Sequence, residues 1–387
     1  MNALKDFSDI IRPIELQSFI SQHWIPKKHL LIRGFPEKFV HLLGWHELSE
    51  ILLSHGHDLS GRLRLVKDGK DIPFSAVRVP EARRLRNEKM PRLNSTLLYE
   101  QLKGGAVLII NLMDEMHEPI RHIAEMMEYA LGERIYINLY AGWQSSKGFN
   151  LHWDDHDVFV LQVHGEKHWT INGFSKLFPL YKEIESIPAP EGKPLWDGVL
   201  QTGDLLYIPR GCWHGAEALD GPTVHLTCGL YSQTGHDLLA WMQSKLRTMD
   251  LFCRDLPRFL ENVEQKQHAE ELKNAFLKLW DDNLIQCFLD TVDEKARPHE
   301  RLSFPHGAFA RKNIAVNEET LILMRNPRPL RLVTDSATGE VCFCAMGKRW
   351  SFHPKTRAIL EFLDQKRRCS FEEFRDAVQP TCDEKTL

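Results

Sequence analysis

The pattern of apolar and polar positions divides the chain into three stretches. In the first stretch, apolar residues recur at helical spacing in some segments and form short continuous runs in others. This pattern predicts helices over 14–22, 45–54 and 117–131, and buried strands over 29–35 and 106–111. From 133 to 230, short β-rich runs are separated by Gly, Pro, Asn and Asp, and helical patterns are few. Many short strands with turns between them favour a sandwich or a barrel.

Helical periodicity returns after Tyr231. It predicts helices over 236–248 and 270–290, which together form a layer too thin to bury their own apolar stripes. We therefore expect them to pack on a neighbouring domain or on a second copy of the chain. A domain boundary is predicted near Pro298. The remaining residues predict a small mixed domain, with a β-hairpin through Gly347 and helices over 355–365 and 371–378.

Composition places the chain among ordinary globular proteins. Its 387 residues are enough for two or three domains, and its apolar and charged fractions are 43% and 26%. The N-terminus lacks a signal-peptide pattern, and no apolar run approaches the length of a membrane span. The eight cysteines form no CxxC pair, which argues against a structural zinc site. We expect reduced thiols and a cytoplasmic location.

Charge changes this picture at one place. The net charge of −4 neither favours nor excludes nucleic acid as a partner of the whole chain. A basic, turn-rich stretch nevertheless contains Arg62, Arg64, Lys67, Lys70, Arg78, Arg83, Arg84, Arg86, Lys89 and Arg92. This stretch is either a path for an acidic or nucleic-acid-associated substrate or a solvated loop face.

Candidate chemistry is concentrated in the β-rich stretch. His152 and Asp154 lie two residues apart at the start of a strand-like run, and side chains at this spacing share one face of a strand. A third ligand is predicted at His214, which follows an apolar run and a kink formed by Pro209 and Gly211. Strands distant in sequence meet around a barrel interior, so the three side chains can converge. Two histidines and one carboxylate suit non-haem Fe(II), although zinc accepts the same ligands.

Other polar residues nearby are weaker candidates for metal binding: His156, His164, His168 and His225. His225 alternates with Thr223 and Thr227, so we expect it to face inward in a structural role. Lys167 is predicted on a strand that pairs back after the turn at 164–166, and a buried lysine is costly without an anion opposite. Asn138 shares strand parity with Tyr136 and Tyr140, and its amide can donate to the same anion.

These motifs resemble a known family. The segments HWDD.DVF.LQV.GEKHW and GDLLYIPRG..H resemble the JmjC-type 2-oxoglutarate oxygenases of the cupin superfamily, over about 135–231. Within that family the chain is most similar to the ribosomal oxygenases, which hydroxylate residues of ribosomal proteins. The resemblance implies a mainly β core with helical additions: a double-stranded β-helix within 1–235, a helical dimerisation segment at 236–298 and a winged-helix-like domain at 299–387.

The resemblance also implies roles for individual residues. His152, Asp154 and His214 would hold Fe(II), and Lys167 would bind the distal carboxylate of 2-oxoglutarate. Asn138 would assist in binding 2-oxoglutarate, and Thr227 is expected to contact it as well. Molecular oxygen would be the second cosubstrate. A homodimer is implied as well. The chain departs from the family pattern where Cys212 and Trp213 precede His214.

Three functions remain open at this point. The leading hypothesis is an Fe(II)- and 2-oxoglutarate-dependent hydroxylase of a protein side chain, with a ribosomal protein as the expected substrate. The second is the same chemistry on another macromolecule, such as a tRNA base or a peptide. The third is a non-catalytic metal-binding cupin that acts as an interaction protein. Lys167 argues against the third, because such a barrel has no need of a carboxylate-binding lysine.

Overall fold

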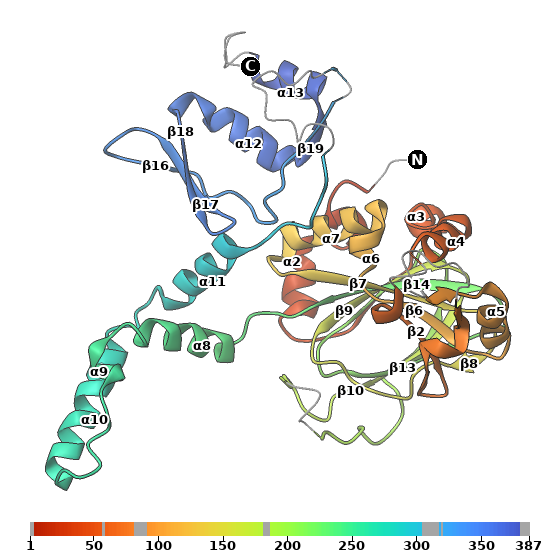
Figure 1. Cartoon of the computed structure of the whole chain (residues 1–387), viewed down its shortest axis with the longest axis horizontal. Helices are drawn as coiled ribbons and strands as arrows, with labels where there is room; N and C mark the ends of the chain where they lie inside the picture. The colour runs from red at the N-terminus through yellow and green to blue at the C-terminus, as the bar shows by residue number, and fades with distance from the viewer. Residues whose placement is uncertain are drawn as a thin grey trace. The chain divides into compact units, whose positions relative to one another are not determined.

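The computed structural model describes residues 4–55, 59–80, 91–180, 186–303, 317–318 and 320–379. The chain divides into two compact units, Met1–Ser232 and Gln233–Leu387 (Figure 1). No helix in the described part of the chain is both long and apolar enough to cross a membrane. All the cysteines in the described ranges are free thiols.

Two β-sheets form the centre of the first unit (Figure 1). The larger sheet has the order β1-β12-β9-β14-β7-β6-β2-β3, and the smaller has the order β11-β10-β13-β8. The strands of the larger sheet are β1 (Leu30–Ile32), β2 (Leu63–Lys67), β3 (Lys70–Ile72), β6 (Val107–Ile110), β7 (Ile135–Gly142), β9 (Asp157–His164), β12 (Leu205–Ile208) and β14 (Thr223–Leu230). Those of the smaller are β8 (Ser146–Lys147), β10 (Lys167–Gly173), β11 (Trp196–Leu200) and β13 (Trp213–Ala218). The predicted mainly β core with added helices is confirmed, and it is consistent with a cupin-type jelly roll.

Strand β9 lies between two hydrophobic cores, which explains why its residues 158–161 are all apolar. Phe159 and Leu161 belong to the large core that includes residues of the helices, whereas Val158 and Val160 pack against Trp169 of the smaller sheet. Both faces of β9 are therefore buried, and such a strand does not alternate apolar and polar residues.

Helices cover the outer face of the larger sheet (Figure 1). The longest is α7 (Glu118–Leu131), whose buried face includes Ile120, Ile123 and Met127. Its bounds, and those of α4 (Trp45–Ser54), agree with the helices that the apolar spacing predicts. The other α-helices among the described residues of this unit are α1 (Phe7–Ile11), α2 (Leu16–Phe19), α3 (Glu37–Val40), α5 (Ser95–Lys103) and α6 (Met113–Met116).

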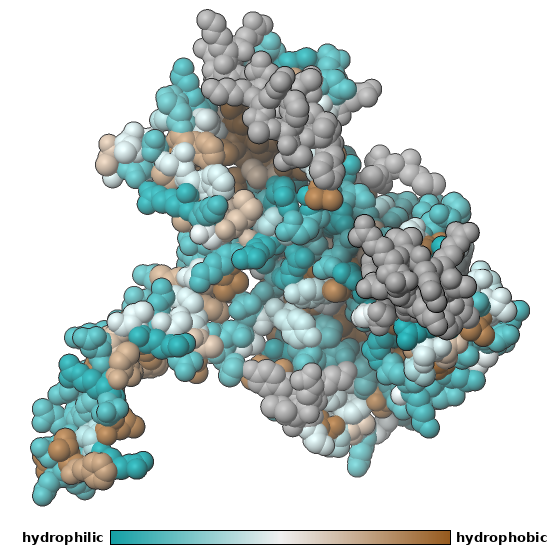
Figure 2. All heavy atoms as spheres, viewed as in Figure 1, coloured by the Kyte–Doolittle hydropathy of each residue, from teal (hydrophilic) through white to brown (hydrophobic). Residues whose placement is uncertain are grey.

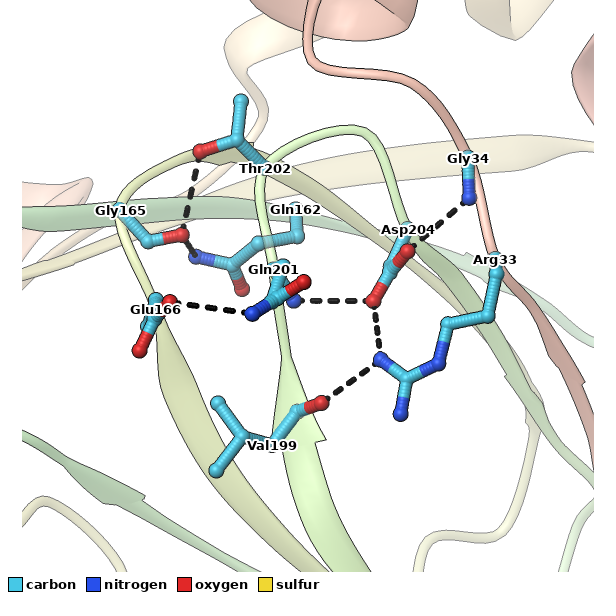
Figure 3. Close-up of polar contacts among 9 residues, drawn as sticks. All are labelled: Arg33, Gly34, Gln162, Gly165, Glu166, Val199, Gln201, Thr202 and Asp204. Atoms are coloured by element: carbon cyan, nitrogen blue, oxygen red, sulfur yellow. Dashed lines mark hydrogen bonds and ion pairs between the residues drawn. The ribbon is translucent and has the colours of Figure 1, made fainter.

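The turn before β12 is held by a buried carboxylate (Figure 3). Asp204 is 2% exposed and accepts hydrogen bonds from the backbone N–H groups of Gly34 (3.0 Å) and Gln201 (2.9 Å). The Arg33 guanidinium forms an ion pair with the same carboxylate. These contacts fasten the Gly203–Asp204 turn to the segment after β1. A side chain at Gly34 would overlap the carbonyl oxygen of Gly203, so this close approach requires glycine.

The second unit begins with α8 (Gly235–Leu246), α9 (Asp250–Cys253), α10 (Asn262–Leu277) and α11 (Leu284–Lys295). The prediction of one helix over 270–290 is wrong, because the chain turns between α10 and α11. At this turn the backbone N–H of Asn283 donates to the Asp281 carboxylate at 2.8 Å. Short polar side chains that bond the local backbone in this way interrupt helices.

A three-stranded sheet and two helices complete the second unit. Strands β16 (Val333–Thr334), β17 (Val341–Ala345) and β18 (Lys348–Phe352) form the sheet, and β17 and β18 are joined by the predicted hairpin through Gly347. Helices α12 (Arg357–Lys366) and α13 (Phe371–Val378) lie where they are predicted. A further strand, β15 (Leu321–Leu323), pairs with β19 (Arg368–Ser370).

Candidate metal centre

The segment that carries His152 and Asp154 is not a regular strand. The prediction that these residues begin a strand is wrong, since β9 starts only at Asp157. His152 instead forms an isolated antiparallel bridge with His214 at the start of β13. Pairing with a distant strand therefore brings the two histidines together, in agreement with the predicted convergence of His214 from a separate segment.

The three side chains face one another at metal-binding distances. The Asp154 carboxylate oxygen Oδ2 lies 3.5 Å from His214 Nε2 and 3.9 Å from His152 Nε2. One ligand atom from each residue lies within 4.8 Å of the others, and a search of the described residues finds no other such group. Ligand atoms about 2.0–2.2 Å from a shared ion have this mutual spacing.

Backbone carbonyl oxygens orient both histidine rings. His152 Nδ1 lies 2.8 Å from the carbonyl oxygen of Asn150, and His214 Nδ1 lies 2.9 Å from that of Cys212. A carbonyl accepts a hydrogen bond, so Nδ1 carries the proton in each neutral ring. In this tautomer Nε2 of each ring carries the lone pair that can bind a metal ion.

A cavity of about 530 Å³ extends from these residues into the space between the sheets. Lys167 lies in its lining, 5% exposed, and pairs with Ala218, four residues along the chain from His214. Burial lowers the pKa of Lys167 from 10.5 to about 7. The prediction that its strand pairs back on β9 is wrong: β10 pairs with β11 and β13, because the turn at 165–166 carries the chain from one sheet to the other.

The floor of the cavity is formed by residues of β7 and β14 that alternate along each strand. Asn138 lines the cavity, and its side-chain oxygen accepts from the Leu112 N–H at 3.0 Å, which leaves the amide NH₂ as its remaining donor. Thr227 and Tyr140 also line the cavity, and the Thr227 hydroxyl donates to the backbone carbonyl oxygen of Asn138 at 3.3 Å. Burial, and secondarily the charge of Asp154, raises the pKa of Tyr140 to about 12. Tyr140 was not predicted as a site residue, although its strand parity with Asn138 pointed to it.

Two buried ring nitrogens face the same space without a hydrogen-bond partner among the described residues. His225 stacks on Tyr140 with ring centroids 4.9 Å apart, and Trp169 meets His225 edge-on. Within the described residues, His225 Nδ1 and Trp169 Nε1 have no hydrogen-bond partner, and both side chains line the cavity. Burial, followed by the charge of Lys167, lowers the pKa of His225 well below its ordinary value. The inward orientation predicted for His225 is confirmed.

Of the remaining candidate histidines, one lines the cavity and two lie outside its lining. His156 lines the cavity with its ring 4.9 Å from that of Tyr231. His164 bonds the carbonyl oxygen of Leu43, and His168 bonds Asp197, so both are engaged elsewhere. Cys212, which departs from the family pattern, is buried in the core between the sheets.

The basic stretch is partly neutralised by acidic neighbours. Arg62 pairs with Glu115, and Arg64 pairs with Asp71 while lining the cavity. Four of its residues, Arg83, Arg84, Arg86 and Lys89, lie outside the described residues. A substrate path along this stretch stays a prediction.

Comparison with known proteins agrees with this geometry. Residues 111–238 match the JmjC domain family. Ribosomal oxygenase 2 of Rattus norvegicus is 27% identical over 72% of this chain and 60% of its own length. Ribosomal oxygenase 1 of Gallus gallus is 27% identical over 59% of this chain and 37% of its own length. A Drosophila sechellia protein named bifunctional lysine-specific demethylase and histidyl-hydroxylase NO66 is 28% identical over 59% of this chain and 34% of its own length. The chain thus spans less than two thirds of these relatives.

A solved structure shares the fold. The Escherichia coli ribosomal oxygenase YcfD, in complex with cobalt and 2-oxoglutarate, superposes with a TM-score of 0.56 at 16% identity. The match covers 95% of this chain and 94% of that one. Residues 111–238 therefore match the JmjC domain family, and the chain resembles the ribosomal oxygenases in sequence and in fold.

Proposed function

We propose that the chain is an Fe(II)- and 2-oxoglutarate-dependent oxygenase that hydroxylates a side chain of a protein, and that the substrate is a ribosomal protein. One observation carries the proposal: a cluster of two histidines and one carboxylate opens into the same cavity as a buried lysine. A metal site and a site for an anionic cosubstrate are therefore adjacent.

The donor set fits the proposed metal. His152, Asp154 and His214 would hold Fe(II) through two imidazole nitrogens and one carboxylate oxygen, leaving coordination positions for other ligands. When bound there with 2-oxoglutarate, the ion supplies the activation of molecular oxygen, coupled to oxidative decarboxylation of the cosubstrate. The protein contributes the orientation of the ligands and a cavity that limits contact with water.

The buried polar groups of the cavity, Lys167 and the ring nitrogens of His225 and Trp169, fit the proposed cosubstrate. A buried donor without an acceptor costs about 1–3 kcal/mol, and an unpaired buried ammonium costs more. A carboxylate near Lys167 would pair with its charge, and His225 and Trp169 offer further hydrogen bonds. Asn138 and Thr227, with Tyr140, would line the path between this carboxylate and the metal.

The substrate class is inferred from the relatives. Their names give ribosomal oxygenase and, in one case, histidyl-hydroxylase activity. No observation specifically favours a tRNA base or a peptide as the substrate. A non-catalytic cupin would leave the buried charge of Lys167 unexplained.

We further propose the domain organisation that the resemblance implies: an oxygenase domain at 1–235, a dimerisation segment at 236–298 and a winged-helix-like domain at 299–387, in a cytoplasmic protein. Large apolar side chains on the helical segment support a homodimer (Figure 2). Phe259 is 95% exposed, Val263 76% and Ile285 64%, and exposed large apolar side chains of this kind favour an interaction site. The ion-paired arginines of the last domain give no particular reason to expect nucleic-acid binding.

The proposal is tested by incubating the protein with Fe(II), 2-oxoglutarate and a ribosomal protein extract. We expect succinate release and the gain of one oxygen atom by one ribosomal protein, measured by intact mass spectrometry. The His152→Ala variant is the control and should show neither. Turnover of equal size in that variant would reject the proposed metal site.

A further inference from the structure

Asp157, the first residue of β9, is buried beside the candidate metal centre but does not belong to it. It is 1% exposed and lies three residues after Asp154. A carboxylate this deeply buried is costly unless charges and hydrogen bonds compensate it. The groups that do so come from three different parts of the chain.

The first of these groups is a lysine 130 residues away. Lys27 Nζ lies 2.9 Å from both carboxylate oxygens of Asp157, and its side chain is only 10% exposed. Lys27 also lies over the ring of Trp24, which in turn stacks on Tyr207. The ion pair thus joins the N-terminal segment to the start of β9.

The other two groups belong to β12 and to the kink that follows it. The Tyr207 hydroxyl donates to Asp157 Oδ1 at 2.8 Å, and the backbone N–H of Arg210 donates to the same oxygen at 3.2 Å. The next residue in the kink, Gly211, donates its N–H to the backbone oxygen of Asp154 at 2.8 Å. One buried carboxylate therefore binds the kink that leads to His214, and the kink binds Asp154.

The contacts of Asp157 and Gly211 hold the segment that contains His152 and Asp154, which has no regular secondary structure of its own. Residues 150–156 form no strand, and the segment is fastened at one side by the bridge between His152 and His214. At its other end, the contacts of Asp157 and Gly211 fix the distance between Asp154 and the kink. Groups behind the ligands commonly set metal affinity by holding the ligands in position.

We propose that Asp157 is a positioning residue of the metal centre: through Lys27, Tyr207 and the Arg210 N–H it holds Asp154 and His214 at the separation that a metal ion requires. The inference rests on the proposed function, since it assumes that these residues bind a metal. It assigns to Asp157 an effect on metal geometry beyond its effect on folding stability.

A buried carboxylate elsewhere in the same unit provides a matched control. Asp204 is also almost fully buried and also pairs with a basic side chain, and it accepts two hydrogen bonds, both from backbone N–H groups (Figure 3). It does not line the cavity and bonds no residue of the metal cluster. Asp204→Asn should therefore lower thermal stability without a specific effect on the metal centre.

The experiment titrates the full-length wild type and its variants with Co(II) and records the ligand-field absorption spectrum and the affinity. We expect Asp157→Asn to weaken Co(II) binding by about tenfold or more and to change the spectrum. Loss of a residue that holds a metal ligand in position typically weakens metal binding by about 10- to 100-fold. Asp204→Asn should keep the wild-type spectrum and an affinity within about twofold. Tyr207→Phe removes one hydrogen bond but keeps the ion pair, and should weaken binding by a smaller factor even if Asp157→Asn does not fold.

The possible failures are distinguishable. If the wild type binds Co(II) but neither Asp157→Asn nor Tyr207→Phe differs from Asp204→Asn in affinity and spectrum, the positioning role is overturned and the proposed function stands. If the wild type itself shows no Co(II) binding that depends on His152, both proposals fail.

Discussion

The backbones of His152 and His214 are hydrogen-bonded to each other in both directions. The His152 N–H donates to the His214 carbonyl at 3.0 Å, and the His214 N–H donates to the His152 carbonyl at 2.7 Å. The imidazole centroids are 4.4 Å apart as a result. Two candidate metal ligands separated by more than sixty residues in sequence are thus placed by a single pair of backbone contacts, and Asp154 is the third candidate ligand.

Removal of the Asp154 carboxylate should abolish metal-dependent turnover and leave the fold intact. The side chain is 20% exposed and supplies the only anion of the cluster, so its loss leaves two neutral ligands. We expect Asp154→Ala to weaken Co(II) binding by more than about 100-fold, beyond the effect of losing an outer contact. The neighbouring Asp155 lies outside the cluster, and Asp155→Ala should retain metal binding. Normal turnover in Asp154→Ala would show that the ligand set is wrong.

Replacement of Lys167 should raise the requirement for 2-oxoglutarate. A charge-assisted hydrogen bond is worth about 1.5–3 kcal/mol, which corresponds to a change of about 10- to 150-fold in Kd. We expect this loss in Lys167→Met, measured by calorimetric titration of the Mn(II)-loaded protein. Lys38, 4% exposed but outside the cavity, supplies the control: Lys38→Met should leave the affinity unchanged. An unaltered affinity in Lys167→Met would place the cosubstrate elsewhere.

Binding of 2-oxoglutarate should take up a proton above neutral pH. The pKa of Lys167 is lowered to about 7 by burial, and a carboxylate partner favours the charged ammonium. Below this pKa the lysine is already charged, so affinity should change little with pH. Above it the proton must be acquired on binding, and affinity should fall by about tenfold per pH unit. Calorimetry in buffers of different ionisation enthalpy measures the uptake, which should be absent in Lys167→Met.

A charge on the exposed helical segment should disrupt the proposed dimer. Phe259 is 95% exposed. In light scattering at micromolar concentration, we expect the wild type to be a dimer and Phe259→Asp to be a monomer. An aspartate in a packed apolar interface would be desolvated without a partner. Ile25, 66% exposed in the first unit, is the control, and Ile25→Asp should leave the dimer intact. A monomeric wild type would contradict the role of this segment.

The sequence alone determined many of the local elements and the choice of the candidate ligands. Helices such as α4 and α7 follow from apolar spacing, because helical periodicity is a property of neighbouring residues. The spacing of His152 and Asp154, with His214 after a kink, selected the three side chains that the structure brings together.

Tertiary structure alone decided how these residues meet. Both faces of β9 are buried, so its residues 158–161 are all apolar and do not indicate which strands lie beside it. For this reason the sequence did not predict that the next strand, β10, belongs to the other sheet and pairs with β11. The bridge between His152 and His214, and the ion pair between Lys27 and Asp157, join segments far apart in the chain. Such contacts depend on long-range pairing, and a local pattern of apolar and polar residues does not encode which distant partner a segment will find.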